Sequence, residues 1–176
     1  MTVALTSIKI STDFDSGNIQ VLDASDAYQL LLAIQPDTRS HHYQWFHFKA
    51  EGMHVGHTHN FRLSNAGGSS YRHAWSGYNA VASYDHVNWF RVPTRFDGEI
   101  LHISLETREK HAWLAYFEPY SRERHDWLIE QALGKAGTEL LATGKSVEGR
   151  DIQLLRKGSG AEGQRKVWII AQQHPG

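Results

Sequence analysis

Short runs of alternating apolar and polar residues, separated by turn residues, fill the first two thirds of the chain. Strands are expected at residues 7–11, 18–22, 28–34, 43–49, 61–63, 80–84, 89–92, 99–105 and 113–117. The 43–49 run, YQWFHFK, is apolar on both faces, which is typical of an inner strand. Many short strands at this spacing predict a mainly β domain, an antiparallel β-sandwich, over residues 1–118.

The pattern changes from period two to helical spacing after Pro119. Ser121 is a candidate N-cap and Gly134 a C-terminal stop. Between them the apolar positions that share one helical face are Leu128, Ile129, Ala132 and Leu133, with Trp127 beside it. The sequence therefore predicts a helix between Ser121 and Gly134.

Two further strands are expected at 139–143 and 152–156, joined by the turn GKSVEGRD. The last apolar run, VWIIA at 167–171, has the composition of a central parallel strand, with polar residues following its carboxyl end. Residues 119–176 thus indicate the beginning of an α/β unit. An exposed edge on such a strand predicts poor solubility or self-association into a homo-oligomer.

Composition narrows the class of protein. The chain has 176 residues, 40% of them hydrophobic, and a net charge of −1, so it has no overall basic field for nucleic acid. The basic residues Arg72, Arg91, Arg95 and Arg108 are scattered among acids. No apolar run approaches a membrane span, and the N-terminus lacks the features of a signal peptide.

Cysteine is absent, which removes disulfides, thiolate zinc sites and cysteine nucleophiles and fits a cytoplasmic location. Metal binding would have to use His with carboxylates or water. His54, His57 and His59 lie within six residues, but Gly52 and Gly56 make this segment flexible, so a solvated hairpin turn is the favoured interpretation and metal binding stays open.

Three other features are assigned structural roles. His41 and His42 follow a loop, whereas His47 lies in an apolar strand and is expected to be a satisfied core or interface histidine. Thr143-Gly144-Lys145-Ser146 matches the tail of a phosphate-binding loop, but position 139 is Glu rather than Gly and no helix is expected after it, so a hairpin turn is favoured. The aromatic residues expected in the core rather than on a binding platform are Trp75, Tyr78, Tyr84, Trp89 and Phe90.

Two sets of residues carry a resemblance to a known family. KSVEGRDI at 145–152, followed by a predicted strand ending in His174-Pro175-Gly176, resembles the opening of an M14 zinc carboxypeptidase domain. The upstream segments that resemble the extra N-terminal domain of the cytosolic carboxypeptidase subfamily are DFDSGN (13–18), YQWFHF (43–48), SNAG (64–67), WFRVPT (89–94) and AYFEPYS (115–121). The resemblance implies a β-sandwich at 1–118, followed at 119–176 by the first helix and strands of an incomplete α/β carboxypeptidase domain.

The same resemblance implies a metal site that this chain does not complete. In the family's H-x-x-E motif, His174 matches the first zinc ligand, and the sequence stops at the third residue. One zinc ion would be completed by ligands not in this chain, and no catalytic residue has a matching position here. The intact protein is expected to be a metallocarboxypeptidase that removes C-terminal residues, glutamate among them, from peptides or proteins. The 176-residue chain alone is expected to be inactive.

A different class of function stays open from the residues themselves. A β-sandwich rich in aromatic residues could act as a binding module for a peptide, a glycan or a partner protein without catalysis. Such a module would have no need of residues 119–176, which favours the peptidase interpretation.

Overall fold

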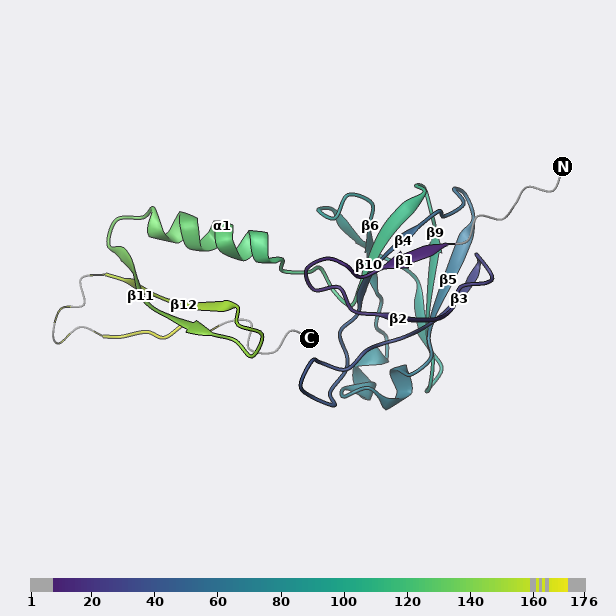
Figure 1. The fold of residues 1–176 in the computed structure, drawn as a ribbon, viewed down its shortest axis with the longest axis horizontal. Coiled ribbons are helices and arrows are strands. Elements are labelled where there is room, and N and C mark those ends of the chain that lie inside the picture. The colour runs from purple at the N-terminus through teal and green to yellow at the C-terminus, as the bar shows by residue number, and fades with distance from the viewer. Residues whose placement is uncertain (1–7, 159–160, 162, 164, 171–176) are drawn as a thin grey trace. The chain divides into compact units, whose positions relative to one another are not determined.

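The structure, a computed structural model, describes residues 8–158, 161, 163 and 165–170. The chain divides into two compact units, the first ending at Pro119 and the second beginning at Tyr120. Figure 1 shows the elements of both units in chain order. Among the described residues, no helix is long and apolar enough to cross a membrane.

The first unit contains two five-stranded sheets. Sheet A has the order β1 (Lys9–Ser11), β4 (His47–Glu51), β10 (His111–Ala115), β6 (Val81–Ser83) and β7 (Trp89–Arg91), and all its pairs are antiparallel. Sheet B has the order β2 (Gln20–Asp23), β3 (Gln29–Ala33), β5 (Thr58–Leu63), β9 (Leu101–Glu106) and β8 (Thr94–Phe96). Its pair β3–β5 is parallel and the other pairs are antiparallel. The mainly β fold with antiparallel sheets is thereby confirmed.

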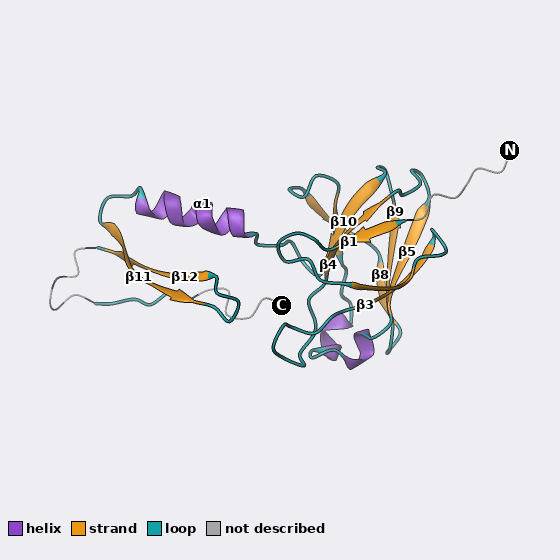
Figure 2. Cartoon of the chain, viewed as in Figure 1, coloured by secondary structure: helices purple, strands orange, loops and turns teal. Residues whose placement is uncertain are grey.

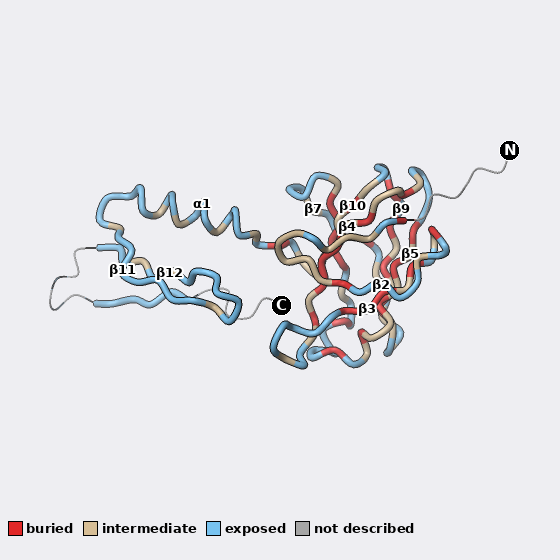
Figure 3. Tube along the Cα trace, viewed as in Figure 1, coloured by how far each residue is buried: buried red, intermediate tan, exposed pale blue. Residues whose placement is uncertain are grey.

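One hydrophobic core joins the two sheets. Alternate residues of β5 and β9 point inward and are fully buried, among them Phe61, Leu63, Leu101 and Ile103. Phe48 of sheet A contacts Phe61 of sheet B, with ring centroids 5.4 Å apart. Figures 2 and 3 show the strands of this unit and the buried positions along them. Two short 3-10 helices, Ala66–Gly68 and Arg72–Trp75, also contribute buried residues.

The connection between β4 and β5 is not the predicted hairpin. The two strands lie in different sheets, so the segment between them crosses the sandwich. Its backbone is bound to the β9–β10 connection: the N–H of Met53 donates to the carbonyl of Lys110 at 2.9 Å, and that of Gly56 to Thr107 at 2.8 Å. Gly52 and Gly56 have φ of 81° and 79°, which glycine adopts without strain. The alternation of apolar and polar residues predicts where the strands lie, but it does not predict which strands pair with each other.

Strand β8 was not predicted, because Thr94–Phe96 follows a proline and is only three residues long. It pairs with β9 at the edge of sheet B, with Arg95 opposite His102.

The second unit consists of a helix beside a hairpin (Figure 1). Helix α1 (Arg122–Leu133) begins at the predicted N-cap, where the Ser121 side chain accepts from the N–H of Arg124 at 3.3 Å, and its C-cap is Gly134. The strands β11 (Thr138–Lys145) and β12 (Asp151–Lys157) pair antiparallel. The His125 ring contacts the Gln153 side chain at 2.9 Å, which ties the helix to the hairpin.

The last predicted strand is not observed. Its described part, residues 167–170, lies outside any strand, and Ile169 is 89% exposed. A strand exists only through hydrogen bonds to a neighbour, and no described residue supplies one here. An apolar run therefore indicates that a segment is suited to burial, but it does not establish that a neighbouring strand pairs with it.

Residues 120–176 are expected to make the chain associate. Helix α1 has no buried residue, and its apolar side chains Trp127, Leu128 and Leu133 are exposed. Such a surface drives association through the hydrophobic effect. We expect the 176-residue chain to bind the dye ANS and to sediment as oligomers, whereas a chain ending at Pro119 stays monomeric and melts cooperatively. A monodisperse 176-residue monomer that binds no dye would contradict this expectation.

Candidate functional site

The His54, His57 and His59 segment forms a network of hydrogen bonds that holds the crossing between β4 and β5. The His59 ring is fully buried, with its Nδ1 donating to the carbonyl of Ala27 at 2.7 Å. Its Nε2 accepts from the N–H of His54 at 3.1 Å. Both ring nitrogens of His59 therefore have hydrogen-bond partners.

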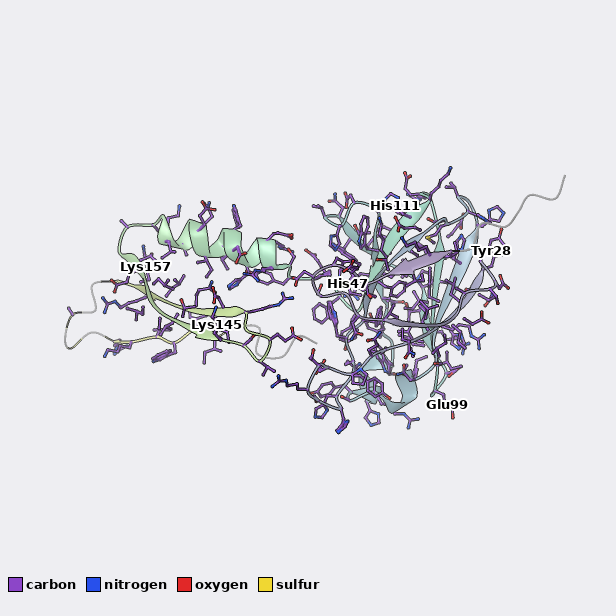
Figure 4. All side chains as sticks on the ribbon, in the orientation of Figure 1. Tyr28, His47, Glu99, His111, Lys145 and Lys157 are labelled. Carbon is purple, nitrogen blue, oxygen red and sulfur yellow. The ribbon has the colours of Figure 1, made fainter. Side chains whose placement is uncertain are left out.

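The other two rings of this segment have separate hydrogen-bond partners, although all three histidine rings contact the Tyr28 ring. His54 Nδ1 lies 2.7 Å from the hydroxyl of Tyr28, which Figure 4 labels, and His57 Nδ1 lies 3.2 Å from the carbonyl of Val55. Among the described residues, no group of three or more His, Asp or Glu could hold a metal ion. Here these histidines support the loop, and the described part of the chain forms no zinc site.

His47 is a buried core histidine, as predicted. It is fully buried at the start of β4 (Figure 4), and its Nδ1 lies 3.0 Å from the Ser16 hydroxyl. Its Nε2 lies 3.3 Å from Nε2 of His86, so one ring donates a hydrogen bond to the other. Burial, reinforced by the nearby His86 charge, lowers the pKa of His47 from 6.5 to about 3, although Asp15 acts in the opposite direction.

The turn after β6 places the second ring of this pair. His86 has φ of 63°, and the Asp85 carboxylate accepts from the N–H groups of Val87 and Asn88 at 2.9 and 2.7 Å. These bonds to backbone N–H groups, that of Asn88 foremost, hold the pKa of Asp85 well below its usual range. The His86 ring stacks on Trp113 of β10, with centroids 5.1 Å apart.

The aromatic residues divide between core and surface. Trp75 is 1% exposed and Tyr78 packs against the core, as expected, whereas Phe90 is partly exposed and contacts Tyr84. Trp89 is half-buried against His47. The prediction that all five side chains lie in the core is therefore wrong for Phe90, which is 38% exposed.

Thr143-Gly144-Lys145-Ser146 ends strand β11 and enters a hairpin turn, in which the N–H of Gly149 donates to the carbonyl of Ser146. A phosphate-binding loop precedes a helix, so the hairpin interpretation is confirmed.

The outer face of sheet B carries a polar hollow that sequence analysis did not single out. Its volume is about 390 Å³, and the side chains that line it include Gln29, Asn60, Arg95, His102 and Ser104. They come from four strands that are adjacent only in the folded sheet, β3, β5, β8 and β9. The available signal was the alternation in β9, where His102 and Ser104 occupy the outward positions between buried apolar residues.

The scattered arginines have different surroundings. Arg72 donates to the carbonyl of Gly98 at 3.1 Å, and Arg91 donates to that of Asn79. Arg95 lies on the hollow, and Arg108 follows β9 in the connection to β10. His174, the predicted zinc ligand, lies outside the described residues.

The profile of the cytosolic carboxypeptidase N-terminal domain matches residues 10–117, which covers most of the sandwich. The chain belongs to this family. The resemblance noted in the sequence is thereby confirmed.

Solved structures of metallo-carboxypeptidases are similar to this chain. One from Pseudomonas aeruginosa, solved in complex with (2-guanidinoethylmercapto)succinic acid, is 59% identical with a TM-score of 0.90, covering 95% of this chain and 44% of that chain. One from Burkholderia cenocepacia is 35% identical with a TM-score of 0.84, covering 91% and 42%. An uncharacterized protein of Zymomonas mobilis is 37% identical over 96% of this chain and 43% of its own length. This member of the family thus spans less than half the length of these relatives.

Proposed function

We propose that this chain forms the N-terminal part of a zinc-dependent metallocarboxypeptidase. The observation that carries the proposal is the 59% identity to a metallo-carboxypeptidase over 95% of this chain. In this proposal, residues 1–118 are a β-sandwich domain and residues 119–176 begin the peptidase domain. The exposed apolar side chains of α1 support it, because a continuing α/β domain would cover them.

The zinc ligand in this proposal is His174, at the first position of the H-x-x-E motif. A catalytic zinc needs about three protein ligands and one open position, so one histidine does not suffice. In the part of the chain that the structure describes, no group of three or more His, Asp or Glu could hold the ion. We therefore expect the 176-residue chain to lack peptidase activity.

The proposed substrates are the C-termini of peptides or proteins, with C-terminal glutamate as one candidate residue. The family's description and the absence of cysteine support a cytoplasmic location.

The test compares this chain with the reading frame extended past Gly176. We expect only the extended protein to hold one zinc ion by mass spectrometry and to trim peptides ending in Glu, Lys or Phe. In the extended protein, His174→Ala should abolish zinc binding and cleavage, whereas His54→Ala should retain both, since His54 contacts Tyr28 rather than a metal. Full zinc content in the His174 variant, or no cleavage by the extended protein, would contradict the proposal.

A further inference from the structure

The outer face of sheet B carries a row of three basic side chains. In the strand register, Arg62 of β5 lies opposite His102 of β9, and His102 lies opposite Arg95 of β8. Directly paired residues point to the same face of a sheet. Adjacent strands are ~4.8 Å apart, so the two arginine Cα atoms lie roughly 10 Å apart with the histidine between them.

The two guanidinium groups have no carboxylate partner among the described residues. The nearby Asp97 is already engaged: its Oδ2 accepts from His102 Nε2 at 2.7 Å, and its Oδ1 from the N–H groups of Glu99 and Ile100 at 3.0 and 2.8 Å. The two guanidinium charges on this row repel each other, and an anion bound between them would relieve the repulsion.

A second row supplies neutral hydrogen-bonding groups. Gln29 lies opposite Asn60, and Asn60 opposite Ser104, whose hydroxyl donates to the Asn60 Oδ1 at 2.8 Å. The Asn60 Nδ2 already donates to the carbonyl of Tyr28 at 3.3 Å, so one of its two N–H groups is left for the hollow, along with the side chain of Gln29. Glu106 lies two positions beyond Ser104 on the same face of β9. The end of this face that carries Arg62 and Arg95 is therefore the more positively charged one.

We propose that this hollow, formed by Arg95, His102, Asn60, Ser104 and Gln29 and flanked by Arg62, binds a small ligand carrying at least two oxyanion groups. Its volume of about 390 Å³ suits a small molecule, and its lining is polar. Arginine recognises carboxylate and phosphate through paired N–H donors, which two guanidinium groups flanking a histidine can supply. The hollow is formed by residues of the sandwich alone, so ligand binding there does not depend on the proposed peptidase function.

The test is calorimetric titration of the full chain at low salt, with citrate and succinate in one arm and pyrophosphate and phosphate in the other. The arms distinguish a carboxylate source from a phosphate source. We expect saturable binding in one arm that weakens as salt is added. The Arg62→Gln, Arg95→Gln double variant should bind at least about tenfold more weakly, because it loses both guanidinium groups.

Arg108→Gln is the matched control. Its backbone N–H, rather than its guanidinium, contacts Tyr84, and it lies beyond the other end of β9 from His102. Unchanged binding in this variant together with the loss in the double variant supports the site. Absence of saturable binding in both arms, retained affinity in the double variant, or an equal loss in Arg108→Gln would overturn it. The melting temperature of the double variant should be unchanged. In that case a loss of binding is due to the lost side chains in the hollow and not to unfolding.

Discussion

Replacing Trp75 with alanine is expected to lower the free energy of unfolding of the sandwich by about 3–5 kcal/mol. Its indole is 1% exposed and packs against Phe46, Tyr78 and Tyr116, with centroids 5.2 to 6.5 Å apart. Its Nε1–H donates to the Ala66 carbonyl at 3.0 Å and also contacts the Ser69 hydroxyl at 2.8 Å. Alanine therefore leaves a cavity and removes a buried donor.

The measurement is urea unfolding followed by far-ultraviolet circular dichroism. Trp75→Phe should cost less, about 1–3 kcal/mol, because it retains a ring and loses mainly the N–H donor. Trp127→Ala is the matched control: this side chain is 61% exposed on α1, so we expect a change within about 0.5 kcal/mol. Equal effects of alanine at positions 75 and 127 would show that Trp75 does not anchor the core.

Acid is expected to destabilise the sandwich through His47. The unfolded chain takes up a proton at the ordinary histidine pKa near 6.5, whereas the folded pKa is about 3. The folded state thus binds fewer protons between these values, so the contribution of His47 is complete above pH ~6.5 and is lost as pH falls towards about 3. At pH 5 the expected loss is about 2 kcal/mol, at ~1.4 kcal/mol per pH unit.

The measurement compares unfolding at pH 7.5 and pH 5 in the wild type and in His47→Gln. The variant removes the titrating group, so the difference between the two pH values should shrink by about 2 kcal/mol even though the variant is less stable overall. His41→Gln replaces an exposed histidine and should retain the full difference. A wild-type pH dependence in the His47 variant would rule out this histidine as the source.

Local patterns account for the parts of the fold that were predicted. Ser121 caps α1 and Gly134 ends it because capping depends on residues within one turn of each other. The inward positions of β9 were recognised because side chains alternate along a strand whatever its partner. His47 was assigned to the core on the same basis, from its apolar neighbours in the strand.

Pairing between strands was not predictable in this way. The crossing between β4 and β5 and the parallel pair β3–β5 depend on which distant segments bury a common face. Residues 167–170 show the converse, since an apolar run without a described neighbour forms no strand. The contacts of His47 with Ser16 and His86 likewise join three segments that are far apart in the sequence.

The sequence by itself determined the strand-rich composition of the first unit, the helix with its caps and the family, because these depend on local periodicity and short motifs, whereas His174 as a zinc ligand stays a prediction. Only the tertiary structure decided that the rings of His54, His57 and His59 gather around Tyr28 with different hydrogen-bond partners, and that Arg62, His102 and Arg95 form one row. The physical reason is that strand register sets which side chains become neighbours, and register is fixed by burial of the whole sandwich core.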